Sequence, residues 1–371
     1  MLSSPHSMTT RALPNAARIP LALLILFLYG CGTKPGQVFV PPNPPIVFPP
    51  PPEPTRISWV GQLITEADLK PGKSGMKGLQ EALFGKEPIR SMLTPMAVCT
   101  DGKSRLFVAD SNAQLVHVFD LDTRKYAQWK PAKDAVFSQP VGVAWDPAGQ
   151  RLLVSDSAAA TVFVFDNAGN LTAQWSGDRS QRPCGIAVDA PRNRVLVVDT
   201  GTHELLELSP AGDVTRRVGH RGGALGEFNY PTHLAVDRVG RVYVSDTLNF
   251  RVQQFSPDLK PLRQIGSHGD LPGYFAAPKG VATDSENHVY VIDAQFESVQ
   301  IFDDHGQLLL DFGEEGTPPA EFWLPNGIFI DPADRIWVAD SYNRRVQVFD
   351  YHRQTPPPEK DSPPSPVEVK P

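Results

Sequence analysis

The chain of 371 residues contains only three cysteines, and none stands in a C-x-x-C pair. So few cysteines exclude a disulfide-stapled scaffold and give no spacing typical of a cysteine-ligated metal site. Positive charge is also scarce, because 35 Lys and Arg stand against 41 Asp and Glu, and the net charge is -6. Nucleic-acid binding requires a clustered basic surface, so we expect no nucleic-acid partner.

The apolar run of residues 21–28 is too short to span a membrane, because a spanning helix needs about 20 apolar residues. It follows Arg11 and Arg18, as the apolar core of a signal peptide does. The segment "LYGCG" resembles a bacterial lipobox, which implies that residues 1–30 are a signal peptide and that Cys31 is acylated. The alternative is an ordinary secretory signal with an incidental cysteine.

The resemblance to lipoproteins carries a localisation. Gly32 follows the cysteine where Asp would favour retention in the inner membrane, so we expect a lipid-anchored envelope protein of the outer membrane, facing the periplasm or the exterior. Residues 31–54 are rich in proline, which favours an extended spacer, and residues 353–371 form a proline-rich tail that we expect to be disordered. The globular part is therefore predicted to be residues 55–352.

Six copies of one unit fill this globular part. Each begins with a proline, continues as P-x-G-x-x-x-D or a variant of it, and adds an apolar run ending in Asp and an alternating strand. The copies begin at Pro95, Pro140, Pro183, Pro231, Pro278 and Pro325. Their spacing of 43 to 48 residues is typical of propeller blades of four strands. Glycine recurs in the first strand, where converging backbones leave little room for a Cβ: Gly142, Gly185, Gly280 and Gly327.

The sixth copy lacks its fourth strand, because the chain turns into "YHRQTPPP" after Asp350. Residues 55–61, "TRISWVG", have the matching pattern, so the sequence predicts an all-β, six-bladed propeller whose N-terminal strand closes the last blade. An insertion at residues 64–94 contains Met76, Leu79, Leu83 and Phe84 near helical spacing, which predicts a short amphipathic helix. It would pack over the ring, cover its mouth or bind a partner.

The copies resemble NHL repeats. "VSDTLNFRVQQF" and "VADSYNRRVQVF" match the repeat consensus, and "GHRGGALGEFNYP" and "GSHGDLPGYFAAP" match its connector. Blades 2 and 3 depart from the motif with "SAAATV" and "TGTHEL". The resemblance implies a binding or scaffold module for an envelope protein, peptide or glycan, and we expect a monomer without a cofactor.

The acids repeated in every copy are expected to hold turns rather than to catalyse. Candidate binding residues are those that vary around the predicted axial mouth: Met96, Val141, Cys184, Thr232, His233, Lys279 and Asn326. His233 also replaces the glycine that recurs there. No nucleophile triad, phosphate loop or paired-carboxylate motif stands out.

Two further functions remain open at this point. Peptidyl-amidating lyases are similar six-bladed rings whose histidines hold zinc, so a metal-dependent lyase or hydrolase is the main alternative. Its ligands would come from the histidines predicted on the face of the mouth: His203, His220, His233 and His268. A periplasmic ligand sensor is the second alternative.

Overall fold

The computed structural model describes residues 34–71, 89–131, 135–177 and 181–353. The chain forms two compact units, Gln37–Lys70 with Ile89–Pro371, and Met1–Gly36 with Pro71–Pro88. Of the second unit only residues 34–36 and 71 are described, and they carry no helix or strand. The propeller lies in the first unit.

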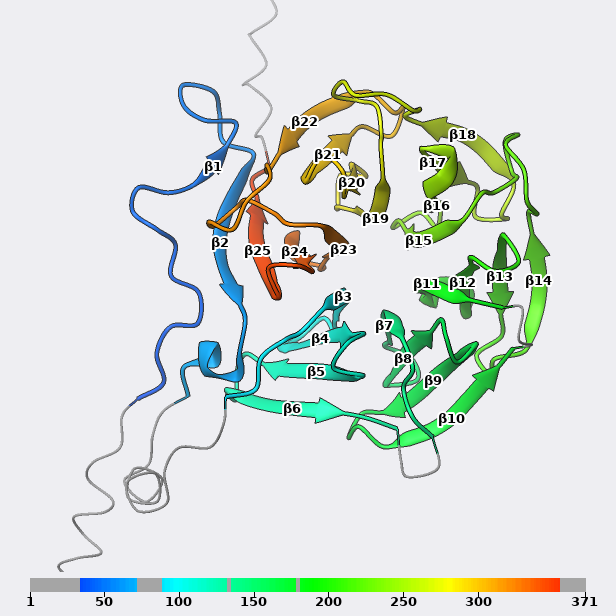
Figure 1. The fold of residues 1–371 in the computed structure, drawn as a ribbon, viewed down its shortest axis with the longest axis horizontal. Helices are drawn as coiled ribbons and strands as arrows, with labels where there is room; N and C mark the ends of the chain where they lie inside the picture. Colours follow the sequence, from blue (N-terminus) through cyan, green and yellow to red (C-terminus); the bar gives the residue numbers. More distant parts are fainter. Residues whose placement is uncertain (1–33, 72–88, 132–134, 178–180, 354–371) are drawn as a thin grey trace, which may run out of the picture. The chain divides into compact units, whose positions relative to one another are not determined.

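Six antiparallel sheets stand around one axis (Figure 1). The inner strands are β3 (Pro95–Thr100), β7 (Pro140–Asp146), β11 (Pro183–Asp189), β15 (Pro231–Val236), β19 (Pro278–Thr283) and β23 (Pro325–Ile330). The second strands are β4 (Arg105–Asp110), β8 (Arg151–Asp156), β12 (Arg194–Asp199), β16 (Val242–Asp246), β20 (Val289–Asp293) and β24 (Arg335–Asp340). The third strands are β5 (Leu115–Asp120), β9 (Thr161–Asp166), β13 (Glu204–Leu208), β17 (Arg251–Phe255), β21 (Ser298–Phe302) and β25 (Arg345–Tyr351).

Five outer strands follow their third strands along the chain: β6 (Lys125–Trp129), β10 (Leu171–Ser176), β14 (Val214–Val218), β18 (Pro261–Ile265) and β22 (Leu308–Phe312). The outer strand of blade 6 is β2 (Ile57–Leu63), from the other end of the propeller unit, and it pairs antiparallel with β25 from Ile57↔Tyr351 to Leu63↔Val346. Figure 1 shows this blue strand beside the red one. The predicted six-bladed propeller and its closing strand are confirmed.

Part of the predicted linker packs on blades 5 and 6. Strand β1 (Val47–Phe48) pairs with β2, and the ring of Phe48 lies 5.5 Å from that of Phe312. Phe39 lies edge-on to Trp337 with ring centroids 6.0 Å apart. These apolar residues are the reason why this proline-rich stretch follows the surface of the ring instead of standing off it.

The described part of the insertion contains one 3-10 turn, η1 (Glu66–Leu69), capped by Thr65. The two ends of the insertion meet, because Met92 N donates to Ile64 O at 3.1 Å. The helix predicted around Met76, Leu79, Leu83 and Phe84 lies outside the described residues. Within the described residues no helix is long and apolar enough to cross a lipid bilayer.

Glycines set the distance between neighbouring inner strands. A Cβ on Gly185 would lie 2.7 Å from His233 Cα, and one on Gly327 would lie 2.5 Å from Met96 O. Both contacts are to backbone atoms of the next blade, which cannot move aside as a flexible side chain can. The predicted close approach of backbones at these glycines is confirmed.

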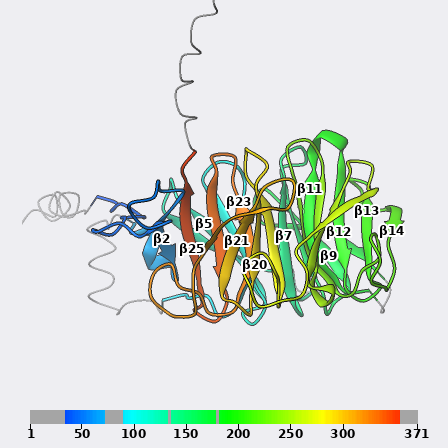
Figure 2. The same ribbon diagram turned by 90° about the horizontal axis from the view of Figure 1, so that it is seen from above.

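The ring has two faces, visible edge-on in Figure 2. The connector face carries the connectors between blades and the turns between second and third strands. The opposite one, with the turns between first and second and between third and fourth strands, is the turn face.

A repeated arginine joins neighbouring blades on the turn face. In blade 3, Arg194 Nε donates to Asp189 at 2.9 Å within the blade, and Arg194 Nη2 donates to Pro257 O at 2.6 Å in blade 4. Arg105, Arg151 and Arg241 make the corresponding pair of contacts. Each arginine therefore ties its own first turn to the outer turn of the next blade.

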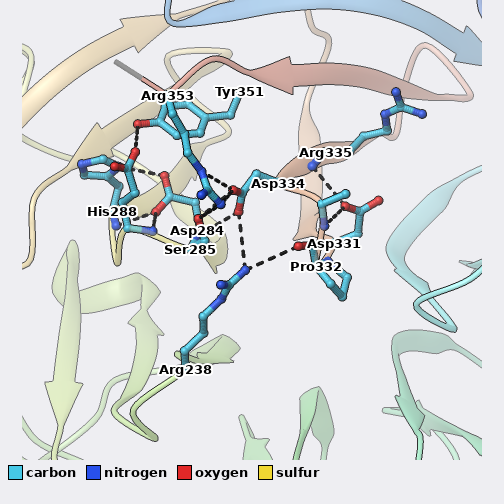
Figure 3. A network of polar contacts seen from close by, with 12 residues as sticks. Arg238, Asp284, Ser285, His288, Asp331, Pro332, Asp334, Arg335, Tyr351 and Arg353 are labelled. Carbon is cyan, nitrogen blue, oxygen red and sulfur yellow. Dashed lines mark hydrogen bonds and ion pairs between the residues drawn. The ribbon is translucent and has the colours of Figure 1, made fainter. Parts of the chain in front are cut away.

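Blade 5 carries His288 at this position, because blade 6 has no continuous turn between its third and fourth strands that an arginine could reach. The contact between these blades is made by another network (Figure 3). Ser285 donates to both oxygens of Asp334 at 2.9 and 2.7 Å, and Arg353 Nη2 donates to Asp334 at 2.6 Å. Arg353 thus brings the end of the described chain into the junction between blades 5 and 6.

Candidate functional site

The residues predicted at the axial mouth surround the axis at the start of the inner strands. Gly142 lies against Cys184 O, Gly185 against His233, Gly280 against Asn326 O and Gly327 against Met96 O, so these starts stand at one level of the ring. The mouth residues are partly exposed, except Thr232, which is buried: Met96, Val141, Cys184, Thr232, His233, Lys279 and Asn326. The structure brings the predicted set together around one opening.

His233 is held inside the mouth. Its Nδ1 lies 3.1 Å from Thr232 Oγ1, which lies 2.7 Å from Thr247 Oγ1. Burial and the positive charge of Lys279 lower the pKa of His233 to about 3, although a hydrogen bond with the Asn326 side chain raises it. The imidazole is therefore neutral near pH 7 and adds no charge to the mouth.

Lys279 is the cationic residue of this set. Its side chain is half-buried, and burial lowers the pKa of its ammonium group, while the neighbouring Cys184 opposes this shift. Among the described residues no carboxylate forms an ion pair with Lys279. The mouth therefore presents a positive charge without a counter-ion in the described part of the chain.

The two described cysteines are poor nucleophiles. Cys184 Sγ lies 3.7 Å from Ser157 Oγ and 3.6 Å from Thr200 Oγ1, and burial raises its pKa. Burial also raises the pKa of Cys99, which lies in the core between blades 1 and 2. Only a thiolate attacks efficiently, so neither residue is suited to covalent catalysis near neutral pH.

Below the mouth, a channel of about 210 Å³ runs along the axis between the inner strands. Each inner strand is an edge strand, so one side of its backbone presents N–H and C=O groups that the sheet does not pair. Buried backbone groups need a polar partner, which makes the channel suited to water rather than to an apolar ligand. We therefore place the candidate site at the mouth and on the connector face around it.

Aromatic side chains gather on the connector face. The exposed large aromatics are Tyr230, Tyr274, Trp323 and Tyr342, which are 43–57 % exposed. Three precede an inner strand in a connector, and Tyr342 lies in the turn between β24 and β25. Trp323 and Tyr342 lie together, with ring centroids 5.6 Å apart and Tyr342 N donating to Trp323 O at 3.1 Å. The sequence analysis missed this group, although three of its members stand in the connectors shortly before a repeated proline.

The four histidines of the metal hypothesis have separate surroundings. His203 Nδ1 accepts from Tyr230 N at 3.0 Å, His220 lies 3.4 Å from Glu227, and His268 packs on Phe250 with ring centroids 4.2 Å apart. In the described part of the chain no three His, Cys, Asp or Glu side chains are grouped closely enough to hold a metal ion. These residues therefore do not fit the zinc centre of the lyase alternative.

The repeated acids have the predicted structural role. Asp156 accepts from Ser138 N at 2.7 Å, Gln139 N at 2.9 Å and Ala159 N at 2.9 Å, and the acids at this position are fully buried in every blade. Each therefore holds the connector and the turn of its own blade. In blade 1, His117 adds a contact of 3.1 Å to Asp110 from within the core.

Comparison with known families identifies the repeat in two of the six blades. The NHL repeat model matches residues 228–255 and 322–349, the parts of blades 4 and 6 from the end of the connector through the third strand. The chain is a six-bladed propeller with NHL repeats in blades 4 and 6. Its motif residues hold the connectors: Asn343 Nδ2 donates to Gly316 O at 2.8 Å, and Arg345 Nη2 donates to Glu321 O at 2.7 Å. Asn249 makes the corresponding contact with Gly222 O in blade 4, also at 2.8 Å.

Solved structures share the fold of this propeller at low identity. A structural genomics protein of unknown function from Bacteroides thetaiotaomicron VPI-5482 is 19 % identical with a TM-score of 0.57, over 70 % of each chain. An auxiliary nutrient binding protein from the same organism is 11 % identical with a TM-score of 0.57, over 71 % of this chain and 70 % of that one. Virginiamycin B lyase from Staphylococcus aureus is 12 % identical with a TM-score of 0.53, over 70 % and 95 %. A comparison with curated proteins gives no match.

Proposed function

We propose that this NHL-repeat propeller is a binding module that docks a protein or peptide partner on the connector face of blades 4 to 6. The observation that carries the proposal is the placement of the exposed aromatics, which lie on this face alone among the described residues. Aromatic residues are enriched at protein interfaces, and Trp and Tyr are enriched among the few residues that dominate the binding energy. The rigid ring beneath holds them in place without an ordering cost on binding.

A protein surface suits this face better than a glycan. Leucines stand exposed among the aromatics, with Leu248 at 50 % and Leu271 at 63 % exposure. Aliphatic side chains gain free energy by covering apolar surface, whereas a sugar presents mainly hydroxyl groups. The fold is compatible with a binding or scaffold role, and NHL repeats commonly mediate protein binding.

A peptide-display experiment with the full chain tests the function. We expect selected peptides to lose affinity by about tenfold or more when Trp323→Ala and Tyr342→Ala are combined, as for central aromatic anchors. Val239→Ala is the control, because Val239 is 56 % exposed on the turn face. Equal binding by both variants would contradict the proposal. Retention on purified envelope polysaccharide without any peptide binding would show a glycan ligand instead.

Attachment to the envelope belongs to the same proposal. Cys31 lies outside the described residues, and its acylation rests on the lipobox-like segment "LYGCG". With Cys31→Ser we expect a protein without acyl chains that no longer fractionates with the outer membrane. Mass spectrometry of the mature N-terminus checks this, and unchanged acylation would contradict the anchor.

The described residues give neither alternative a supporting geometry. A metal-dependent lyase or hydrolase requires convergent ligands, which the described histidines do not provide. The likeness to virginiamycin B lyase is at 12 % identity and concerns the fold alone. A periplasmic sensor would need an element with two alternative arrangements. Nothing in the described part of the chain points to such an element.

A further inference from the structure

The mouth contains a lysine whose charge the described residues leave unbalanced. Lys279 stands at the start of β19, and its backbone is fixed because Lys279 O accepts from Ser245 Oγ of blade 4 at 2.5 Å. The titratable groups that act on its ammonium are Cys184 and His233, and both are neutral near pH 7. A half-buried cation is stabilised by an opposite charge, so this position favours an anion.

A hydrogen-bond donor stands in the next blade. The Asn326 side chain acts on His233, whose pKa it raises. Its –NH2 group carries two donors, and no hydrogen bond from this group to the described residues is found. The backbone of Asn326 lies directly beside Gly280, the neighbour of Lys279, because a Cβ on Gly280 would lie 2.6 Å from Asn326 O.

The opposite side of the mouth is apolar. Met96 and Val141 occupy the corresponding positions in blades 1 and 2, and they offer neither a charge nor a side-chain donor. The polar groups are therefore confined to blades 3 to 6, on the side of the ring that carries the exposed aromatics. Trp323 precedes Asn326 by three residues in the same connector and strand.

We propose that the axial mouth is a carboxylate subsite, in which Lys279 pairs with a carboxylate of the docked peptide and Asn326 donates to it. The carboxylate is the end of the peptide chain or an acidic side chain. One ammonium group matches a monoanion, whereas a phosphate dianion would keep one charge uncompensated. The remainder of the peptide lies on Trp323 and Tyr342. This inference rests on the proposed function, because it names the group of the peptide that the mouth recognises.

The test uses acetate and its neutral analogue acetamide as probes on the full chain. Lysines are labelled with 13C-methyl groups, and the Lys279 resonance is assigned by its loss in Lys279→Arg. We expect this resonance to shift saturably with acetate and not with acetamide, and the pKa of its ammonium group to rise as acetate binds. The exposed Lys103 and Lys125 serve as internal controls and should not saturate.

Variants separate the two contacts. Asn326→Ala should weaken acetate binding about fivefold, the effect of one lost hydrogen bond. Inorganic phosphate added in place of acetate should bind more weakly than acetate. The subsite is overturned by a Lys279 shift that does not saturate, by equal shifts at Lys103 and Lys125, or by tighter binding of phosphate. Because saturation by acetate is measured on the wild-type chain, a failure of Asn326→Ala to fold does not leave the question open.

The two proposals fail in different ways. If displayed peptides bind through Trp323 and Tyr342 but acetate does not saturate Lys279, the carboxylate subsite is wrong and the docking face stands. If acetate saturates Lys279 but no peptide depends on the two aromatics, the mouth binds a small anion and the peptide function is wrong.

Discussion

At the scale of single residues, the spacing of the inner strands depends on glycines, which have no side chain. Gly185 and Gly327 let the backbone of the next blade approach to a distance that a Cβ would block. His233 occupies the corresponding position of blade 4, where its side chain enters the mouth instead. A substitution at one of these positions therefore changes both the spacing of the blades and the surface around the axis.

Gly185→Ala should destabilise the ring. The added Cβ would lie 2.7 Å from His233 Cα and 2.9 Å from Leu234 N, so the blades must separate. Overpacking of this kind costs about 1–3 kcal/mol. Gly223→Ala is the matched control, because its Cβ would meet nothing within 4 Å and its cost should stay within about 0.5 kcal/mol. Urea unfolding monitored by tryptophan fluorescence measures both, and equal stabilities would contradict the packing argument.

His117 occupies a position that glutamine fills in other blades. His117 Nε2 lies 3.1 Å from Asp110, and Gln253 Nε2 donates to Asp246 at 3.0 Å in blade 4. We expect His117→Gln to keep the free energy of unfolding within about 1 kcal/mol of the wild type, because the contact is replaced.

His117→Ala should cost about 2–4 kcal/mol, since it opens a cavity and removes the hydrogen bonds to Asp110 and Tyr126. Thermal unfolding of the two variants side by side checks the ranking. A glutamine variant as unstable as the alanine variant would show that the imidazole has a role beyond this contact.

At the scale of elements, the turn face shows why the blades differ. Arginines at the start of second strands reach the outer turn of the next blade, but blade 6 has its outer strand from the other end of the propeller unit. At that junction His288 pairs with Asp284 at 2.7 Å, and Arg353 binds Asp334. The His288 ring also lies 5.9 Å from that of Tyr351 in blade 6, so a histidine contributes to the contact between blades 5 and 6.

The ion pair of His288 should make this junction pH-dependent. Hydrogen bonding to Asp284 raises the pKa of His288 above its ordinary value of 6.5, against the effect of burial. Its stabilisation is fully present below pH 6.5 and is lost as the pH rises through the raised pKa. The melting temperature of the wild type should therefore fall relative to that of His288→Gln over this range. A constant difference between the two proteins would show that the pair contributes nothing.

The repeated elements could be predicted from the sequence, and the unique contacts could not. The strand "TRISWVG" was found because it shares a pattern with other outer strands, and the close approach at glycine follows from its recurrence. The contact of Arg353 with Asp334 has no counterpart in other blades, so alignment of the copies does not reveal it. The environment of Lys279 depends on which side chains of neighbouring blades lie beside it. The sequence pattern places the four histidines of the metal hypothesis on one face of the ring, but the distances between them depend on the diameter of the ring.

The NHL motif also shows what alignment of the copies cannot explain. Blade 3 lacks the motif's Asn and Arg, and its connector, residues 177–182, is half as long as the one that Asn249 and Arg251 hold, residues 219–230. Connector length alone does not explain this departure, because blade 5 has Phe296 and Ser298 at the two positions and a connector as long as that of blade 4, residues 266–277.

At the scale of the whole propeller, ring closure depends on the pairing of β2 with β25. Arg345 reaches Gln62 at 3.0 Å, and Trp59 Nε1 donates to Gln347 at 2.9 Å, so side chains reinforce the ladder between the two strands. The junction is apolar on its inner side, where Ile57 and Phe349 are fully buried. Removal of β2 would expose this surface and leave the edge of β25 unpaired.

A chain that begins at residue 64 should not form a stable monomer. Loss of β2 removes the outer strand of blade 6 and uncovers core residues such as Phe349, so we expect aggregation or a large loss of stability. A chain that begins at residue 55 keeps β2 and loses only β1 and the residues before it, so it should remain folded with a lower melting temperature. Size-exclusion chromatography with light scattering distinguishes these outcomes, and a monodisperse, folded ring without β2 would contradict the closure argument.

The pairing of Ile57 with Tyr351 also sets the order in which the protein can fold. Joining strands so far apart in the chain costs about 5 kcal/mol of loop-closure entropy if nothing between them has formed, but little once five blades already hold the ends near each other. The N-terminal strand must therefore wait, unpaired, until the third strand of the last blade has been made. A protein built in this way completes its last blade only after Tyr351 has been made, and until then β2 is the segment most exposed to wrong partners.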